Sequence, residues 1–585
     1  MSARWVHHVS YNDLSLVAEE IGSAPLIRQV LERLKLDKLL GFYVGEKALG
    51  RRSKLPHART IRVMIYNILI SREPLYGVRT WMRGRAVEFF GVRPEEAELL
   101  SDDRIARALD RLYEVDPASF VTELIVTAVR EFDLDLDQIH NDTTTVTFSG
   151  AYEGQKDKEE LKRPPLITFG YNKDHRPDLK QLVYSLTISA DGAVPVHYKT
   201  YDGNTTDDQT HVRTWDAVRK LRGDARFMYV ADSKLCTREN MKYIDGEGGR
   251  FLTVLPRSRK EDDDFREHLR RLPVPWKEVR RTPHPRNRSK PDSVYWGYEW
   301  DRPSAEGYRI VWYVSSVKAE EDQKTRTRRI KRARQRIEEL EGRTGAHRFR
   351  SVETAQKAAD EVLQEEGASR WLEVRVQEDK VRDYKQLGPG RPGKRTKYRR
   401  VEYPFLLFEV QERSDVIKDD AKCDGLFAMV TNAPAPAEEV KEGQSNPLTA
   451  QELLAIYKYQ PFLEKRNEQL KSVLDVAPVW LKKPERVAAM LFVYFLAVLI
   501  MALIEREVRN RMKERGIPSL PLYPEDRICK APTTEFIFKA FDGIRRSHLL
   551  DVDGRHVRTF YDNLTPVAKQ LIQLLGVDKR AYGLR

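Results

Sequence analysis

Apolar residues in the N-terminal part of the chain recur at intervals of three and four positions. This spacing runs through residues 17–36, 60–71 and 102–115, and it is typical of helices that bury one face. Ser101 directly precedes the third segment and is suited to cap its first turn. The pattern predicts a helical N-terminal domain over residues 1–130.

From about residue 134 the apolar spacing changes to that of strands. Residues 136–148 are rich in β-branched side chains, 181–190 alternate apolar and polar positions, and 194–200 follow a turn signal at 190–193. A helix is then expected through about Lys220, followed by a short apolar strand at 227–232. Three antiparallel strands, a helix and a fourth strand are the order of an RNase-H-like fold, in which strands one and four are neighbours. We therefore expect an α/β core, a mixed sheet flanked by helices, beginning at residues 131–240.

Residues 241–445 have the composition of an insertion into this core. Apolar runs at 250–256, 308–317, 403–410 and 425–432 predict strands, and a charged stretch at 318–366 predicts helix. Two basic runs lie at 324–336 and 388–400, and each is compatible with a solvated surface or with phosphate contacts. Gly390-Arg391-Pro392 is similar to the minor-groove core of an AT-hook, although three residues are a weak signal and a basic loop is the simpler interpretation.

The chain becomes helical again from residue 450, so that 446–515 form the second part of the core and 516–585 a helical tail. Residues 487–504 are 18 consecutive uncharged positions, which is the minimum length of a membrane-span candidate. Charged residues flank this single run on both sides, and a helix that is apolar all round is also found inside large soluble domains. We expect a buried helix and no membrane association.

Charge and cysteine content indicate the kind of partner and the cellular compartment of the protein. The 585 residues include 102 Lys and Arg against 89 Asp and Glu, a net charge of +13, which suits a polyanionic partner but does not alone distinguish one from a generic basic protein. The three cysteines are sparse and match no zinc-ligand spacing, which indicates a reducing compartment. The N-terminus has no apolar stretch of the kind a secretory signal needs. We therefore expect a cytoplasmic protein.

Three acidic residues stand where a phosphoryl-transfer site could form. Asp142 is in the middle of a predicted strand, where Asp is disfavoured, and Asp232 ends another strand. Glu464 lies seven residues after Tyr457 and seven before Lys471, close to one helical face. Pro461 complicates that stripe, because the helix either begins near it or is kinked there. Each position also has an ordinary structural interpretation, such as an exposed strand residue or a surface ion pair.

Several of these segments together resemble a known family of enzymes. The segments HNDTTTVTFSG, YVADSKLCTREN, DGLFAMVTN and YKYQPFLEKRNEQLKS are similar, in this order, to bacterial insertion-sequence transposases of the DDE type. More narrowly, they resemble the branch with a β-rich insertion before the catalytic Glu and a Tyr-Arg-Glu-Lys signature around it.

The resemblance implies a function, a metal and partners. It implies cut-and-paste DNA transposition by a homodimer on terminal inverted repeats and target DNA, with Mg²⁺ as cofactor and Mn²⁺ as a substitute. Asp142, Asp232 and Glu464 correspond to the catalytic metal ligands. Tyr457 and Lys471 match the Tyr and Lys of the signature and are expected DNA contacts. Gln460 stands where the signature has Arg, so the phosphate contact is lost or supplied by Arg466.

Two other functions are compatible with the same residues. An RNase-H-like nuclease would cleave DNA by the same chemistry without joining donor to target. A catalytically inactive descendant of a transposase would bind DNA through the basic residues, and the N-terminal helices are the expected DNA-binding domain in either case. The presence of all three acidic positions weighs against the inactive form.

Overall fold

The computed structural model describes residues 14–45, 54–148, 152, 163–173, 176–283, 291–342, 349, 351–436, 447–473 and 481–585. The N-terminus for which a secretory signal was considered lies outside these residues. The chain divides into two compact units. Unit 1 comprises the described parts of residues 1–253 and 454–585, and unit 2 those of 254–442 and 446–453.

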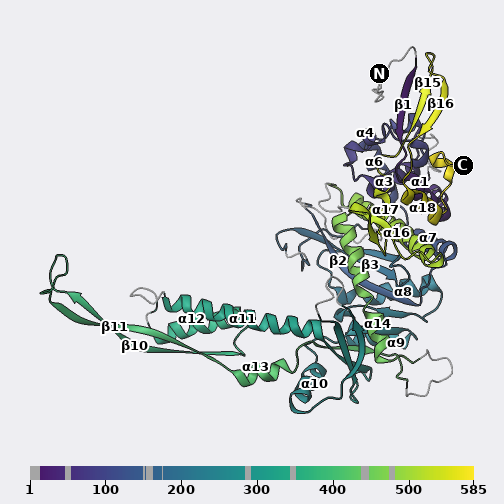
Figure 1. Cartoon of the computed structure of the whole chain (residues 1–585). Coiled ribbons are helices and arrows are strands. Elements are labelled where there is room, and N and C mark those ends of the chain that lie inside the picture. The colour runs from purple at the N-terminus through teal and green to yellow at the C-terminus, as the bar shows by residue number, and fades with distance from the viewer. Residues whose placement is uncertain are drawn as a thin grey trace. The chain divides into compact units, whose positions relative to one another are not determined.

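A mixed sheet forms the centre of unit 1 (Figure 1). Its strand order is β4-β3-β2-β5-β6. β2 pairs antiparallel with β3 and parallel with β5, and β5 pairs parallel with β6. The predicted strands at 136–148, 181–190, 194–200 and 227–232 are confirmed. The bounds are β2 (Gln138–Phe148), β3 (Lys180–Ser189), β4 (Pro195–Tyr201), β5 (Met228–Val230) and β6 (Arg250–Val254).

Helices precede this sheet in the sequence, as the apolar spacing predicted. The Ser101 side chain accepts a hydrogen bond from the Arg104 amide at 3.2 Å and caps the helix that buries Ile105 and Leu109. Further helices follow β4 and β5. The bounds are α1 (Ala24–Arg33), α2 (Leu36–Tyr43), α3 (His57–Ile70), α4 (Val78–Met82), α5 (Pro94–Ala97), α6 (Asp102–Tyr113), α7 (Pro117–Phe132), α8 (His211–Arg222) and α9 (Arg238–Gly246).

The apolar segment after the candidate Glu forms one long helix, α16 (Pro484–Glu514). Within the part of the chain that the structure describes, α16 is the one helix long and apolar enough to cross a membrane, yet 89% of its most apolar window is buried. It packs against α3, α6 and β4. Arg486 near its start forms an ion pair with Asp110 of α6 at 2.7 Å. The predicted core helix is therefore confirmed.

The two ends of the chain contain strands that the sequence did not predict. Residues 17–20 were assigned to a helix but belong to β1 (Ser15–Glu20), which pairs antiparallel with β15 (Arg545–Leu550). β15 pairs in turn with β16 (His556–Tyr561), so the expected helical tail is only partly helical. Its other elements are β13 (Leu520–Tyr523), β14 (Arg527–Cys529), α17 (Thr534–Lys539) and α18 (Pro566–Leu575).

Unit 2 begins at residue 254, later than the insertion expected from residue 241, because β6 pairs with β5 of unit 1. It contains antiparallel strands in the order β12-β9-β8-β7, and the ring of Phe265 stacks on that of Trp312 in β9 at 3.9 Å. The bounds are α10 (Lys260–Arg271), β7 (Lys277–Thr282), β8 (Ser293–Glu299), β9 (Arg309–Ser315) and β12 (Leu426–Thr431).

The charged part of unit 2 consists of two helices and a long hairpin (Figure 1). The stretch at 318–366 forms α11 (Ser316–Gly342) and α12 (Val352–Glu365). β10 (Leu372–Gln386) and β11 (Tyr398–Glu412) pair antiparallel along their whole length and are followed by α13 (Ser414–Ala421).

Candidate functional site

The parallel pairing of β2 and β5 brings Asp142 and Asp232 to the same level of the sheet. His140 of β2 pairs with Val230 of β5, and each aspartate lies two residues beyond its member of that pair. Successive side chains alternate between the faces of a strand, so residues two apart share a face. Asp232 still has an extended backbone, at φ −68° and ψ −173°. The two carboxylates therefore lie at the same level on one face of the sheet, Asp142 within β2 and Asp232 just beyond the end of β5.

The third acidic residue lies on a short helix that hydrogen bonds to β2. The predicted continuous helix is divided into α14 (Ala450–Tyr457), α15 (Gln460–Glu468) and a π-helical turn at Gln469–Val473. Pro461 is in the first turn of α15, so the helix begins there rather than being kinked. As a result Tyr457, Glu464 and Lys471 do not share the face of one regular helix. Lys471 is half-buried in the π-helical turn.

Two amides hold α15 on the central strand, one on each side of Glu464. Gln460 pairs with His140 Nδ1 at 2.9 Å, and Asn467 Nδ2 donates to Asp142 Oδ2 at 3.3 Å. Positions 460, 464 and 467 are four and three residues apart and lie along one helical face. The side chains of Gln460 and Asn467 are buried, whereas that of Glu464 is exposed to solvent at the rim of the carboxylate site.

The carboxylates and Tyr457 share one electrostatic environment. Burial raises the pKa of Asp142 to about 6, and the nearby charges of Asp232 and Asp207 add to this rise. Burial likewise raises the pKa of the Tyr457 hydroxyl to about 12, with contributions from Asp232, Glu464 and Asp142. The structure thus brings the three predicted acids within electrostatic range of a single phenol.

The positive charge of the site comes from a lysine that no sequence pattern singles out. Lys173 Nζ lies 3.6 Å from Asp142 Oδ1 and 3.0 Å from Asp207 Oδ2, and it donates to the Thr143 carbonyl at 2.7 Å. Burial opposes the charge of Lys173, but Asp142 and Asp207 outweigh it and raise the lysine pKa. Asp207 also accepts a hydrogen bond from the Thr143 hydroxyl. Lys173 lies in a turn and Asp207 begins a single 3-10 turn, so neither has periodic neighbours and only tertiary structure reveals them.

The two residues expected to replace the signature Arg have other roles in this structure. Arg466 is 3% exposed, and its guanidinium forms an ion pair with Glu505 of α16 at 2.9 Å. It also donates to the carbonyls of Ala193 and Gly192 at 3.0 and 3.1 Å. Gln460 is 6% exposed and bonded to β2. The polar groups of both residues are thus engaged within the protein, and the expectation that Arg466 or Gln460 contacts DNA stays a prediction.

The carboxylate side chains of this site are of the chemical type that binds a hard divalent cation. Mg²⁺ prefers carboxylate oxygens, and a buried aspartate with a raised pKa is a site where negative charge lacks full compensation. Among the described residues, however, the structure forms no group of three or more His, Cys, Asp or Glu side chains that could hold a metal ion as they stand. Asp142 and Asp232 are the positioned pair, and Glu464 is the residue at the rim.

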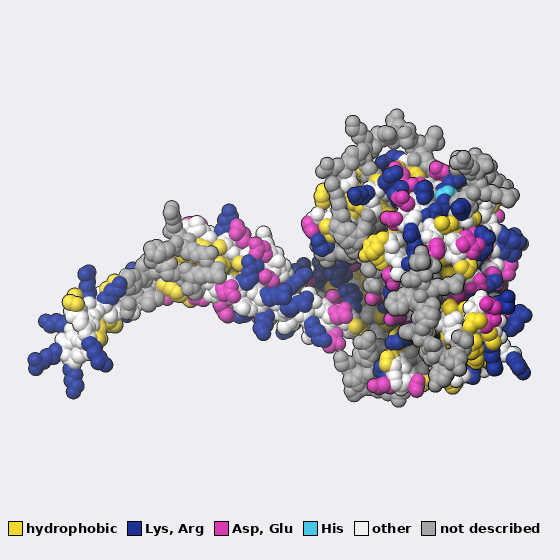
Figure 2. All heavy atoms as spheres, turned by 90° about the horizontal axis from the view of Figure 1, so that it is seen from above, with side chains coloured by type: hydrophobic (Ala, Val, Ile, Leu, Met, Phe, Trp, Pro, Cys, Tyr) yellow, Lys and Arg dark blue, Asp and Glu magenta, His cyan; other side chains and the backbone are white. Residues whose placement is uncertain are grey.

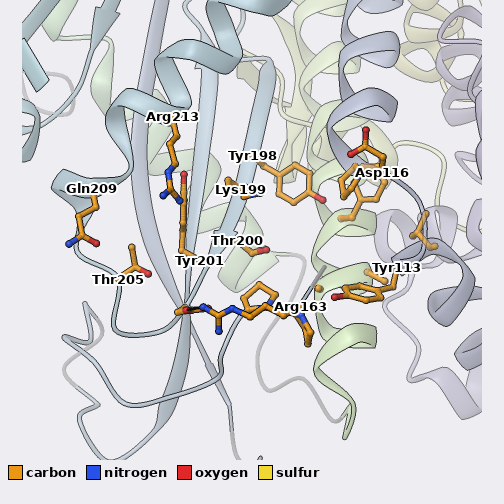
Figure 3. A pocket seen from close by; sticks show the side chains of 18 residues that line it. Tyr113, Asp116, Arg163, Tyr198, Lys199, Thr200, Tyr201, Thr205, Gln209 and Arg213 are labelled. Atoms are coloured by element: carbon orange, nitrogen blue, oxygen red, sulfur yellow. Dashed lines mark hydrogen bonds and ion pairs between the residues drawn. The ribbon is translucent and has the colours of Figure 1, made fainter. Parts of the chain in front are cut away.

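A separate open cavity of about 1050 Å³ lies beside β4 in unit 1 (Figure 3). Tyr198 and Tyr201 of β4, Tyr113 of α6 and Arg213 of α8 are among its lining residues, and none of the three predicted acids is. Arg163 at its edge forms an ion pair with Asp202 at 2.9 Å. This cavity is therefore distinct from the carboxylate site.

Comparison with known proteins gives one family match and several solved structures. A family described as a domain of unknown function (DUF4277) matches residues 16–126, which include α1 to α6. No curated protein matches. The chain is similar to a piggyBac transposase synaptic complex with hairpin DNA, at 8% identity over 88% of this chain and 78% of that one, with a TM-score of 0.36.

Two structures of Mos1 transposase also match over smaller parts of the chain. One is a paired-end complex with the left transposon end, at 11% identity over 34% of this chain and 59% of that one. The other is a pre-cleavage transpososome, at 11% identity over 39% of this chain and 77% of that one. Both have TM-scores of 0.13. At such scores the likeness does not establish a shared fold, and the functional argument rests on the site itself.

Proposed function

We propose that this protein is a DDE-type DNA transposase that cleaves transposon ends and joins them to target DNA. The observation that carries the proposal is the placement of Asp142 and Asp232 at one level of adjacent parallel strands, with Glu464 on a helix that hydrogen bonds to the first of them. The order and local sequence of these segments resemble the motifs of that family, except that Gln460 stands where its signature has Arg. Double-stranded DNA is the proposed partner and a homodimer the proposed active form.

Asp142, Asp232 and Glu464 are the residues that would hold Mg²⁺. Two divalent ions of this kind activate the attacking oxygen and neutralise the leaving one in phosphodiester chemistry. Because Glu464 is at the exposed rim while the two aspartates are held by the sheet, we propose that the bound state brings Glu464 to them. Mn²⁺ should serve in place of Mg²⁺.

The remaining residues of the site bind and orient rather than react. With a pKa of about 12, the Tyr457 hydroxyl keeps its proton at neutral pH and can donate a hydrogen bond to a phosphate oxygen. Burial lowers the pKa of His140 to about 4, so this imidazole stays neutral and its bond to Gln460 holds α15 in place. Lys173 balances the charge of Asp142 and Asp207 in the metal-free protein.

The proposal is tested by replacing Asp142, Asp232 or Glu464 with Ala and measuring end cleavage and duplex binding by the full-length protein. Each change should abolish Mg²⁺-dependent cleavage and leave duplex affinity unchanged, because binding rests on basic residues. Glu468→Gln is the matched control, since Glu468 is an exposed acid one turn further along α15, and it should cleave normally.

The products distinguish the proposed function from its rivals. Cleavage without joining of donor to target DNA would indicate a nuclease. Binding without cleavage by the unaltered protein would indicate an inactive descendant. If Glu464→Ala retained full cleavage, the assignment of the third ligand would be wrong.

A further inference from the structure

The β10–β11 hairpin of unit 2 has two halves with opposite character. In the proximal half, Leu372, Val374 and Val376 of β10 and Phe408 of β11 are buried against α11 and α12. Gln356 of α12 bonds to the backbone of this half, donating to the Val374 carbonyl at 2.9 Å and accepting from the Val376 amide at 3.1 Å. This end of the hairpin is fixed by a hydrophobic cluster.

Val376 is the last residue of β10 in that cluster, and Leu406 of β11, opposite Glu378, packs against its edge. The ten residues from 377 to 386 span about 30 Å at roughly 3.3 Å per residue. Tyr384, Leu387 and Tyr398 are 63%, 59% and 48% exposed, so these apolar side chains of the distal half do not pack into a core. An isolated two-stranded ribbon is only marginally stable, which favours a role in contacting a partner. We call residues 385–400, the end of this distal half, the basic tip.

All charged side chains of the basic tip are positive. Its 16 residues include seven basic and no acidic side chains: Lys385, Arg391, Lys394, Arg395, Lys397, Arg399 and Arg400. Figure 2 shows Lys and Arg side chains gathered at the end of this hairpin. Lys385 pairs directly across the ribbon with Arg399, and like charges at such a position destabilise a sheet. A polyanion on the ribbon would remove that repulsion.

Hydrogen bonds and two glycines define the backbone turn of the tip. Gln386 Nε2 donates to the carbonyls of Gly388 and Gly390 at 3.1 and 2.9 Å. Both glycines have positive φ, 106° and 130°, which other residues rarely adopt. The Gly393 amide donates to Thr396 Oγ1 at 2.7 Å. The cations are therefore presented on a defined turn, which lowers the entropic cost of binding.

We propose that the basic tip of the β10–β11 hairpin is a docking element for the phosphate backbone of duplex DNA. The choice of duplex DNA rests on the proposed function, while the anionic nature of the partner rests on the charges of the tip alone. A two-stranded ribbon fits the major groove of B-DNA, which is about 12 Å wide, and its basic side chains then reach the phosphates on either side.

The test measures binding of the full-length protein to a random-sequence duplex of about 30 base pairs in magnesium-free buffer, by fluorescence anisotropy over roughly 50 to 300 mM salt. The tip variant carries Arg391→Gln, Lys394→Gln and Arg395→Gln. These three side chains are exposed, and none forms an ion pair with another described residue, so the fold should be unaffected. Each phosphate contact contributes about 0.9 to the slope of log K against log salt, so the slope should fall by about 2–3, with at least roughly tenfold weaker binding at about 150 mM salt.

A second variant has the same change in net charge elsewhere. It carries Arg226→Gln, Arg555→Gln and Arg580→Gln, which are 81%, 78% and 87% exposed in unit 1. This variant should keep the original slope to within about 1. An equal change in both variants would mean a general effect of net charge and would overturn the proposal, as would an unchanged slope in the tip variant.

Two further measurements separate the alternatives. A charge-conserving variant, with Arg391→Lys, Lys394→Arg and Arg395→Lys, should retain the slope. If the tip variant lost affinity for single-stranded RNA and kept its affinity for duplex DNA, the proposed partner would be wrong. Because binding is measured without magnesium, failure of this proposal is independent of whether Asp142 and its neighbours cleave DNA.

Discussion

Replacing Asp142 with Asn should stabilise the metal-free protein at alkaline pH, although the change removes a proposed catalytic group. In the folded protein, burial holds the pKa of Asp142 at about 6, against an ordinary value of 3.8. Folding therefore favours the protonated carboxyl. The resulting destabilisation is absent below about pH 4, grows as the pH rises from about 4 to about 6, and is constant above that.

The size of the effect follows from the two pKa values. A rise from 3.8 to about 6 corresponds to about 3 kcal/mol once the carboxyl is ionised. The side chain is 22% exposed, which screens part of this penalty. The oxygen of the new amide would still accept from the Thr143 N–H. Asn467 Oδ1 is buried and has no hydrogen-bond partner among the described residues, so the Asn467 amide can rotate and this oxygen can accept from the new NH₂ group. We expect a gain of about 1–3 kcal/mol at about pH 8.

Thermal unfolding in EDTA at a series of pH values measures this gain. For a unit of this size about 1 kcal/mol moves Tm by about 1–2 °C, so a gain of about 1–3 kcal/mol should raise Tm by about 1–6 °C at about pH 8 and leave it unchanged near about pH 4. Added Mg²⁺ should raise the Tm of the original protein and not that of the variant. A Tm difference that is the same at both pH values would refute the reasoning, because it would not come from ionisation.

Two other substitutions test the surroundings of the site. Glu505→Gln leaves the buried guanidinium of Arg466 without its 2.9 Å partner and should destabilise the protein by about 3–5 kcal/mol, seen as a lower Tm; an unchanged Tm with lost DNA binding would instead support a phosphate contact for Arg466. Lys173→Met removes the charge that lowers the pKa of Asp142. The destabilisation by Asp142 should then keep growing above about pH 6 in the same Tm series, and an unchanged upper limit would show that Lys173 does not neutralise the carboxylate.

Asp142 and Asp232 could be predicted as a pair because the sequence patterns that identify their strands are local. Alternating and β-branched runs identify the strands, and the order of the elements makes the strands that carry Asp142 and Asp232 neighbours. Pro461 indicated either the start of the helix of Glu464 or a kink in it, and the structure shows the start. Hydrophobic spacing and chain order therefore sufficed for the framework of the site.

The rest depends on contacts between distant segments. Residues 17–20 have an acceptable helical pattern, but they extend as a strand because Glu19 and its neighbours pair with residues 545–550, at the other end of the chain. Arg466 is in a charged segment whose composition predicts exposure. Its burial depends on the position of Glu505 on α16, which only the tertiary structure reveals. Lys173 reaches Asp142 from a loop, where no periodicity marks function.

The pairing of β1 with β15 also affects the order in which a newly made chain can fold. Domains fold largely as units while the ribosome adds about 5–20 residues per second. Unit 2 is synthesised as a nearly continuous stretch and can fold as soon as it emerges, whereas β1 waits for residues 545–550. A chain truncated before residue 545 therefore leaves β1 unpaired, and only chains that include residues 545–550 can close this sheet.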